Sequence, residues 1–396
     1  MNIVFYNKFV KDFEFYIPTK VVFGKKALKQ IPKEISNFGK RALWIYGRSS
    51  IKITGLYEKI KEILSKENIE FVELGGVKSN PLLSKVLEGI ETAKKHKVDF
   101  ILAVGGGSVI DTAKAVACGY YYEGNVWDFF EKKAYPEKAL PIVVVLTIAG
   151  TGSEVNEVSV ITHDIKKIKH SLRSSLLFPK VSFLDPTLTF TVSPEYTAYG
   201  AVDAFSHAFE FFVNREYKKD FLVEDLMVVI MKNIMKWSKI AIKEPTNYEA
   251  RANLMWASSL ALCGLIKAGI GAYRFPIHAI EHTLSGGYNI PHGLGLAILL
   301  RAWIKKYKED DIIKKFFVKV FDLSMKKDRS FSDNGVEFYE KWLRELKIPM
   351  SLKEIGIPEK DIDIIVDKAF EIFLLYGAER EYPKEKIREI LEIAYF

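Results

Sequence analysis

The pattern of apolar residues along this 396-residue chain changes at Asp185-Pro186, and that change constrains the fold more than any other feature. Before this point, short apolar runs alternate with amphipathic stretches; after it, the short runs stop. The runs cover residues 41–46, 69–74, 100–104, 142–146 and 181–184. Strands that alternate with helices form parallel βαβ units, in which helices cover a buried sheet. The sequence therefore predicts an α/β fold for the first half of the chain.

Helices are predicted between these strands and throughout the second half. In the first half we expect an edge strand or hairpin within 13–23, and helices over 27–38, 55–66, 83–97 and 109–117. In the second half we expect helices over 199–213, 221–240, 248–265 and 384–394. A chain of this length is too long for one ordinary core. We predict an α/β domain over residues 1–188 and an all-helical domain over 189–396, packed tightly around a shared cleft.

Two turns rich in small residues follow predicted strands. Gly105-Gly106-Gly107-Ser108 leads into a helix, whose free N–H groups and positive dipole end suit a phosphate group. An ordinary flexible loop is the alternative, and the turn is not the G-x-G-x-x-G fingerprint. Thr147–Ser153 alternates hydroxyls with glycines and could line a ribose or a nicotinamide amide. Two such turns at the carboxyl ends of parallel strands indicate a nucleotide crevice.

Asp203 and His207 are four residues apart, so a helix would project both from one face. A carboxylate oxygen beside an imidazole nitrogen suits iron(II), zinc or a neighbouring divalent metal. By itself, this spacing is more often a surface pair or a satisfied core pair. However, the chain has only seven histidines, and three of them (His278, His282 and His292) fall within one short span. We therefore take metal chemistry as the working hypothesis.

Composition excludes several other classes of protein. The net charge of +8 comes from dispersed lysines, typical of a solvated surface, and we expect no nucleic-acid binding. The two cysteines, Cys118 and Cys263, are too few for a disulfide framework or a thiolate zinc site and fit a reducing compartment. No apolar run is long enough to cross a bilayer, and the N-terminus lacks a signal-peptide layout. We expect a cytoplasmic protein without membrane contact, and the single glutamine beside abundant Lys, Glu and Ile indicates a thermophilic source.

Several motifs occur together in one order along the chain. They are Gly105-Gly106-Gly107-Ser108 with Asp111 and Lys114, Thr147-x-Ala149-Gly150-Thr151-Gly152-Ser153-Glu154, Gly200-x-x-Asp203-x-x-x-His207, His278-x-x-x-His282 and Pro291-His292-Gly293. This set resembles the iron-containing (group III) alcohol dehydrogenase family, and is most similar to its NAD(P)H-dependent butanol dehydrogenase branch. The resemblance covers about residues 13–395. It implies a dehydroquinate-synthase-like fold, with an α/β dinucleotide domain, a helical metal domain and a cleft between them.

The resemblance also implies a set of site residues. The metal, expected to be Fe²⁺ with Zn²⁺ as an alternative, would be held by Asp203, His207, His278 and His292, and His282 would help to move the proton. The coenzyme would contact the glycine-rich turns and their surroundings, at Gly47, Arg48, Ser49, Ser50, Asn80, Gly105, Gly106, Gly107, Ser108, Asp111, Thr147, Thr151, Ser153 and Lys169. Ser79-Asn80-Pro81 and Phe275-Pro276-Ile277 depart from the family pattern, which bears on the pocket wall and substrate size.

The implied activity is metal-dependent reduction of short or medium-chain aldehydes, with the reverse oxidation of primary alcohols, by an expected homodimer. Alternatives are a glycerol dehydrogenase or a dehydroquinate-synthase-type enzyme of the same fold, and more remotely a non-catalytic metal- or nucleotide-binding protein. The stretch Tyr46–Lys52, at the end of the first long strand, has no acidic residue but has Arg48, two serines and Lys52. Since an acidic side chain there would repel a 2′-phosphate, we expect NADP(H) to be preferred and NAD(H) to be possible.

Overall fold

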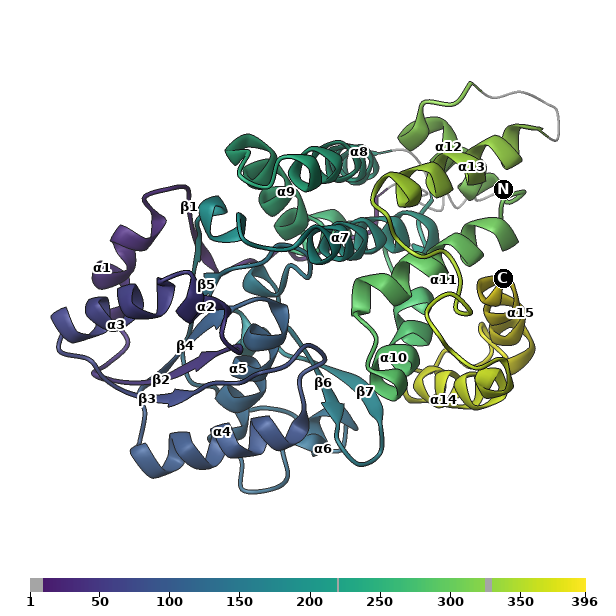
Figure 1. Cartoon of the computed structure of the whole chain (residues 1–396). Helices are drawn as coiled ribbons and strands as arrows, with labels where there is room; N and C mark the ends of the chain where they lie inside the picture. Colours follow the sequence, from purple (N-terminus) through teal and green to yellow (C-terminus); the bar gives the residue numbers. More distant parts are fainter. Residues whose placement is uncertain (1–9, 219–220, 325–329) are drawn as a thin grey trace, which may run out of the picture.

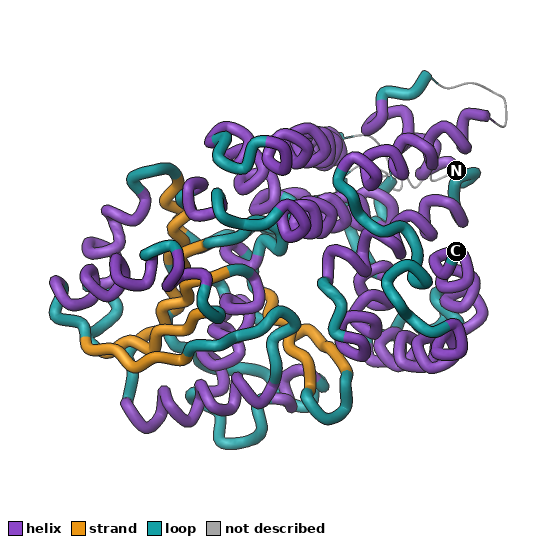
Figure 2. Tube along the Cα trace, in the orientation of Figure 1, coloured by secondary structure: helices purple, strands orange, loops and turns teal. Residues whose placement is uncertain are grey.

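The computed structural model describes residues 10–218, 221–324 and 330–396. A half built on a β-sheet lies beside a half built only of helices (Figures 1 and 2). The fold class predicted from the sequence is confirmed. The sheet half ends near β8, and the domain boundary at residue 188 stays a prediction.

The larger sheet of the described residues has six parallel strands in the order β1-β8-β5-β4-β2-β3. The strands are β1 (Lys20–Phe23), β2 (Arg41–Tyr46), β3 (Glu70–Leu74), β4 (Phe100–Gly105), β5 (Ile142–Leu146) and β8 (Val181–Leu184). Every residue of β4 and β5 is buried, which is why these strands are continuous apolar runs. The chain goes outward from β2 to β3 on one side and from β4 to β5 and β8 on the other. The carboxyl ends of β2 and β4 therefore flank the crevice where such sheets bind ligands.

Helices cover both faces of this sheet (Figure 1). The helices of the sheet half are α1 (Ile31–Ile35), α2 (Ser50–Ile53), α3 (Leu56–Lys66), α4 (Leu83–His96), α5 (Gly107–Gly119) and α6 (Trp127–Phe130). Alternate residues of the strands feed two separate cores. Leu43 and Ile101 pack in the core that includes α4 and α5, while Trp44 and Leu102 pack in the core that includes α1 and α3.

A two-stranded antiparallel hairpin, β6 (Val158–His163) and β7 (Ile168–Arg173), was not predicted. It packs on α5 through β6 and on α10 of the helical half through β7. Because both of its faces are covered, it lacks the apolar–polar alternation that marks a half-buried strand, and β7 buries Lys169 and His170. The predicted edge strand within 13–23 forms only over β1, because residues 13–19 make no ladder with β8.

The second half consists of helices around one core. They are α7 (Pro194–Asn214), α8 (Leu222–Lys243), α9 (Tyr248–Leu260), α10 (Pro276–Tyr288), α11 (His292–Lys306), α12 (Asp311–Phe321), α13 (Ser330–Glu345), α14 (Ile362–Leu375) and α15 (Lys384–Tyr395). Ser193 caps α7 by accepting a hydrogen bond from Tyr196 N, and Pro194 occupies its first turn. No helix in the described ranges combines the length and the apolar content needed to cross a membrane.

Candidate metal centre

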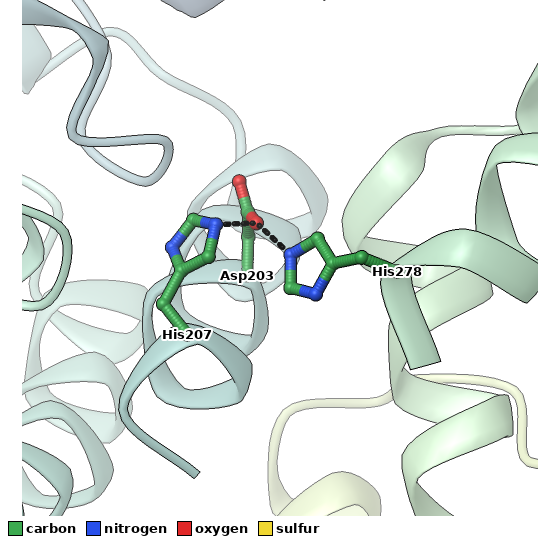
Figure 3. Close-up of side chains that lie close together, drawn as sticks. All are labelled: Asp203, His207 and His278. Carbon is green, nitrogen blue, oxygen red and sulfur yellow. Dashed lines mark ion pairs between the residues drawn. The ribbon is translucent and has the colours of Figure 1, made fainter. Parts of the chain in front are cut away.

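Asp203 and His207 project from the same face of α7, one turn apart, and His278 on α10 faces them (Figure 3). Asp203 Oδ1 lies 3.5 Å from His207 Nε2 and 3.7 Å from His278 Nε2. His292, at the start of α11, places its Nε2 3.8 Å from the same oxygen. Three helices thus direct three imidazole nitrogens at one carboxylate oxygen.

These atoms fit a divalent cation. Asp203 Oδ1 and His278 Nε2 are buried, and among the described residues neither has a hydrogen-bond partner. Buried polar atoms without partners are costly and rare, so an arrangement of them calls for an ion or a water. Asp203, His207 and His278 each offer a ligand atom within 4.8 Å of the others. Nitrogen and carboxylate ligands in this number suit Fe²⁺ or Zn²⁺ and leave room for a substrate oxygen.

Two carboxylates outside this cluster orient the imidazoles. Glu210, one turn after His207 on α7, hydrogen-bonds His278 Nδ1 through Oε2 and accepts from Ile277 N at 2.7 Å. Glu281 hydrogen-bonds His292 Nδ1 through Oε2. Both glutamates are fully buried. A carboxylate on Nδ1 keeps the proton there, which leaves the Nε2 lone pair free to face a metal.

Asp203 carries the negative charge of the cluster. Burial opposes its ionisation, but the imidazoles of His207, His292 and His278 hold the pKa of the Asp203 carboxyl well below its usual range. Burial lowers the pKa of His207 to about 3, so that imidazole is a neutral ligand. Burial also opposes the charged form of His278, yet the carboxylates of Glu210 and Asp203 raise its pKa to about 9. A cation would displace that proton, because metals bind the deprotonated ring nitrogen.

His282 lies one turn after His278 on α10, and its ring is 5.6 Å from that of His292. Burial, the ammonium of Lys169 and the neighbouring imidazoles lower the pKa of His282 well below 6.5. The structure therefore places a neutral, half-buried imidazole beside the predicted ligands. Phe275 lies beside His278 and His207, with its ring 5.2 Å from that of His278 and 6.2 Å from that of His207.

The first glycine-rich turn joins β4 to α5 at the carboxyl edge of the sheet. A Cβ on Gly106 would lie 2.1 Å from Ile148 Cγ2, and one on Gly107 would lie 2.4 Å from Thr151 Oγ1. Glycine is therefore needed for the turns after β4 and β5 to touch. Thr147 belongs to the same contact, because its N–H donates to Gly105 O at 3.1 Å. Ser108 stands in the first turn of α5, whose N–H groups suit a phosphate.

The turn after β5 also reaches the metal cluster. At Gly200 on α7, a Cβ would lie 2.2 Å from Ala149 O, so the turn lies against α7 one helical turn before Asp203. The nicotinamide side of the predicted coenzyme site and the metal cluster are consequently neighbours.

Asp111 and Ser153 connect the two turns through buried hydrogen bonds. Ser153 Oγ donates to Asp111 Oδ1 at 2.5 Å and accepts from Lys114 Nζ at 2.9 Å. Lys114 is fully buried, and it donates to Asn156 Oδ1 as well. Because the polar atoms of Asp111 and Ser153 are used inside the sheet half, these two residues hold the turns together.

The remaining predicted coenzyme residues lie in two places. Arg48, Ser49 and Ser50 are exposed at the carboxyl end of β2, after the half-buried Gly47. Asn80 and Lys169 meet between the two halves, where Lys169 Nζ donates to Asn80 Oδ1 at 2.9 Å.

Sequence reasoning missed Glu210 and Glu281 as functional residues. Glu210 stood out as the lone acid in the apolar run Ala204–Val213 of α7, three residues after His207. An acidic residue on the buried face of a helix calls for a partner, and that was the available signal. Glu281, next to His282, was assigned no role, since its partner His292 belongs to another helix.

Comparison with known proteins gives a consistent result over the whole chain. A family model described as iron-containing alcohol dehydrogenase matches residues 18–186, and one described as the C-terminal part of the Fe-containing alcohol dehydrogenase family matches residues 197–395. NADH-dependent butanol dehydrogenase A of Clostridium acetobutylicum is 39% identical over 97% of this chain and 100% of its own length. NADPH-dependent aldehyde reductase YqhD of Escherichia coli is 30% identical over 97% and 100%. The crystal structure of NADH-dependent butanol dehydrogenase A from Thermotoga maritima superposes with a TM-score of 0.94 at 42% identity, covering 98% and 100% of the two chains.

Proposed function

Since this chain belongs to the iron-containing alcohol dehydrogenase family, we propose that it reduces short or medium-chain aldehydes to primary alcohols with NAD(P)H, and catalyses the reverse oxidation. The observation that carries this proposal is the buried Asp203 oxygen facing three imidazole nitrogens, next to the turn after β5. We propose Fe²⁺ as the metal, held by Asp203, His207, His278 and His292, with Zn²⁺ as the alternative. When bound, the metal would supply Lewis acidity toward the carbonyl oxygen and the nicotinamide would supply the hydride.

The chain's own residues do three things in this reaction. Glu210 and Glu281 fix the imidazoles of His278 and His292, so that little reorganisation is needed when substrate binds. His282 accepts the proton of the substrate hydroxyl in alcohol oxidation, directly or through water, because its imidazole is neutral and lies beside the cluster; in aldehyde reduction the proton returns from the imidazolium to the substrate oxygen. Phe275 forms an apolar wall next to His278, which suits the alkyl chain of an aldehyde such as butanal.

The coenzyme preference depends on the end of β2. We propose that NADPH is preferred, because Arg48 is exposed and makes no ion pair within the described residues, and Ser49 and Ser50 lie beside it. The acid nearest in the sheet, Glu73 on β3, already accepts hydrogen bonds from Tyr46 Oη at 2.6 Å and Tyr57 Oη at 2.7 Å. That carboxylate is therefore engaged and does not compete for a ribose hydroxyl. Relatives named for NADH and for NADPH both match this chain.

We propose a homodimer as the assembly. Strand β1 is an edge of the six-stranded sheet, and Phe23 on it is 42% exposed beside Trp256, which is 41% exposed. An edge strand with exposed apolar side chains is usually covered in a stable protein. Light scattering on the purified chain measures the mass directly, and a monomer at working concentration would refute this part.

A steady-state screen tests the proposed activity. Protein stripped of metal and reconstituted with iron, zinc, cobalt or manganese should consume NADPH or NADH when butanal is added. Glycerol oxidation without butanal reduction would favour the glycerol dehydrogenase alternative. Absence of net coenzyme turnover on any aldehyde or alcohol, despite bound metal, would favour a dehydroquinate-synthase-type or a non-catalytic protein.

A further inference from the structure

A continuous set of hydrogen bonds runs from the sheet half to the metal cluster. Lys169 on β7 donates from Nζ to Asn80 Oδ1, at 2.9 Å, and to Ser285 Oγ on α10, at 3.0 Å. Ser285 Oγ lies 3.2 Å from Glu281 Oε2, and that same oxygen hydrogen-bonds His292 Nδ1. These hydrogen bonds therefore join Lys169, of the predicted coenzyme site, to His292, a predicted metal ligand, through Ser285 and Glu281, which are not themselves predicted site residues.

The direction of these hydrogen bonds follows from the groups involved. An ammonium can only donate, so Ser285 Oγ accepts from Lys169 and its own single proton must point elsewhere. The acceptors within reach are Glu281 Oε2 at 3.2 Å and the backbone oxygen of Glu281 at 3.4 Å, and the carboxylate is the nearer and the stronger acceptor. Glu281 Oε2 then accepts the hydrogen bond that His292 Nδ1 donates. His292 is left with its Nε2 lone pair toward Asp203.

The backbone is shaped for this contact. Lys169, Ser285 and Glu281 are all buried. Next to Ser285, a Cβ on Gly286 would lie 3.3 Å from Lys169 Cβ and 3.4 Å from Lys169 N, so a side chain there would press β7 away from α10. Strand β7 and α10 therefore approach closely where Lys169 donates to Ser285.

We propose that Ser285 is a positioning residue that makes coenzyme binding and metal binding cooperative. A coenzyme that binds at Asn80 and Lys169 restricts the position of the Lys169 ammonium. The Ser285 hydroxyl that accepts from this ammonium is then directed at Glu281, and Glu281 holds His292 in the orientation of a metal ligand. By reciprocity, a bound metal fixes Lys169 for the coenzyme. This inference rests on the proposed function, because it takes both a metal and a nicotinamide coenzyme as ligands.

The test measures metal affinity with and without coenzyme, and not turnover. Metal-free full-length protein is titrated with Zn²⁺ and with Co²⁺ against a competing chelator, alone and with saturating NADPH or NADH. In the unmodified protein, coenzyme should tighten metal binding by ~5-fold or more, the lower end of typical coupling between sites. In Ser285→Ala, that factor should fall to about 1, and metal affinity without coenzyme should fall by no more than ~10-fold, since Glu281 still contacts His292.

Two further variants separate positioning from a general loss of packing. Ser285→Thr keeps the hydroxyl and should restore the coupling. Ser258→Ala removes an equally buried helical hydroxyl, which donates to the Leu254 backbone oxygen and to no other group among the described residues, and should leave the coupling unchanged. If Ser285→Ala does not fold, Lys169→Met interrupts the same set of hydrogen bonds and should also bring the coupling factor to about 1.

The outcomes distinguish the two proposals. Full coupling in folded Ser285→Ala or Lys169→Met, or no coupling in the unmodified protein, would overturn the inference and leave the proposed activity intact. An unmodified protein that binds no divalent metal would overturn both.

Discussion

Asp203, His207 and His278 lie buried among helices, whereas Arg48, Ser49 and Ser50 lie exposed at the edge of the sheet. In the helical half, functional side chains are held by other buried side chains: Glu210 fixes His278, and Glu281 fixes His292. At the sheet edge, the fit to a ligand comes from the backbone, because Gly106 and Gly107 let two turns touch at the start of α5. A single substitution in the buried, mutually dependent cluster should therefore abolish metal binding. A single substitution at the exposed sheet edge should lower coenzyme affinity only by the contribution of that residue.

Asp203→Asn should have the largest effect. It replaces the carboxylate that three imidazoles face with an uncharged amide. Metal binding and turnover should therefore fall below detection. Metal analysis of the purified variant, with circular dichroism to verify the fold, makes the measurement. The substitutions His207→Ala, His278→Ala and His292→Ala should behave alike, and full metal occupancy with near-normal rates in any one would remove that residue from the ligand set.

His282→Ala should come next and should affect rate without affecting metal content. Loss of a positioned proton donor or acceptor lowers turnover by ~100- to 10,000-fold. Stopped-flow aldehyde reduction on protein of verified metal content measures the step. A variant that loses metal as readily as His292→Ala would show that His282 is a ligand, and that its role as proton carrier is wrong.

Glu210→Gln should weaken metal binding by ~10- to 100-fold, as expected when the carboxylate that orients a metal-binding histidine is lost. The amide keeps an acceptor but removes the charge beside His278. Glu154→Gln is a matched control, because Glu154 is equally buried but hydrogen-bonds Ser259 and no histidine. Equal metal affinities of the two variants in chelator competition would argue against an orienting role for Glu210.

Arg48→Asp should have the smallest and most selective effect, in line with the graded behaviour of the sheet edge. One charged contact to a 2′-phosphate contributes roughly 1.5–3 kcal/mol, so NADPH should bind at least ~10-fold more weakly. Binding of NADH should change far less, and it serves as the internal control. Michaelis constants for NADPH and NADH that are equal in the unmodified enzyme would remove the basis for the predicted preference.

The same contrast explains how much the sequence could predict. Continuous apolar runs such as Ile142–Leu146 predicted the parallel strands correctly, because a strand that is covered on both faces consists mainly of apolar residues. Asp203 and His207 could be paired because helical spacing is local. Their meeting with His278 and His292 depends on the packing of three helices, which spacing along the chain does not encode; only the family resemblance suggested it.

What was missed has one physical cause: polar residues whose partners are distant in sequence. No role was predicted for Glu210, which acts on His278, and the contacts of the predicted residue Lys169 with Asn80 and Ser285 were not foreseen. Local patterns assign buried polar residues to the surface, and so the hairpin of β6 and β7 was left without an assignment.

The hairpin also sets where this protein tolerates changes in length. Along β7, Lys169 faces Asn80 and Ser285, while the next residue, His170, stacks on Trp127 at 5.6 Å on the opposite side. Deleting one residue within the strand would exchange these two faces, because side chains alternate along a strand. The ammonium would then point at an indole, and an imidazole would replace it between the halves. Insertions are therefore expected in the exposed turn at Ile165–Lys167 among natural variants, and not in the strands that it joins.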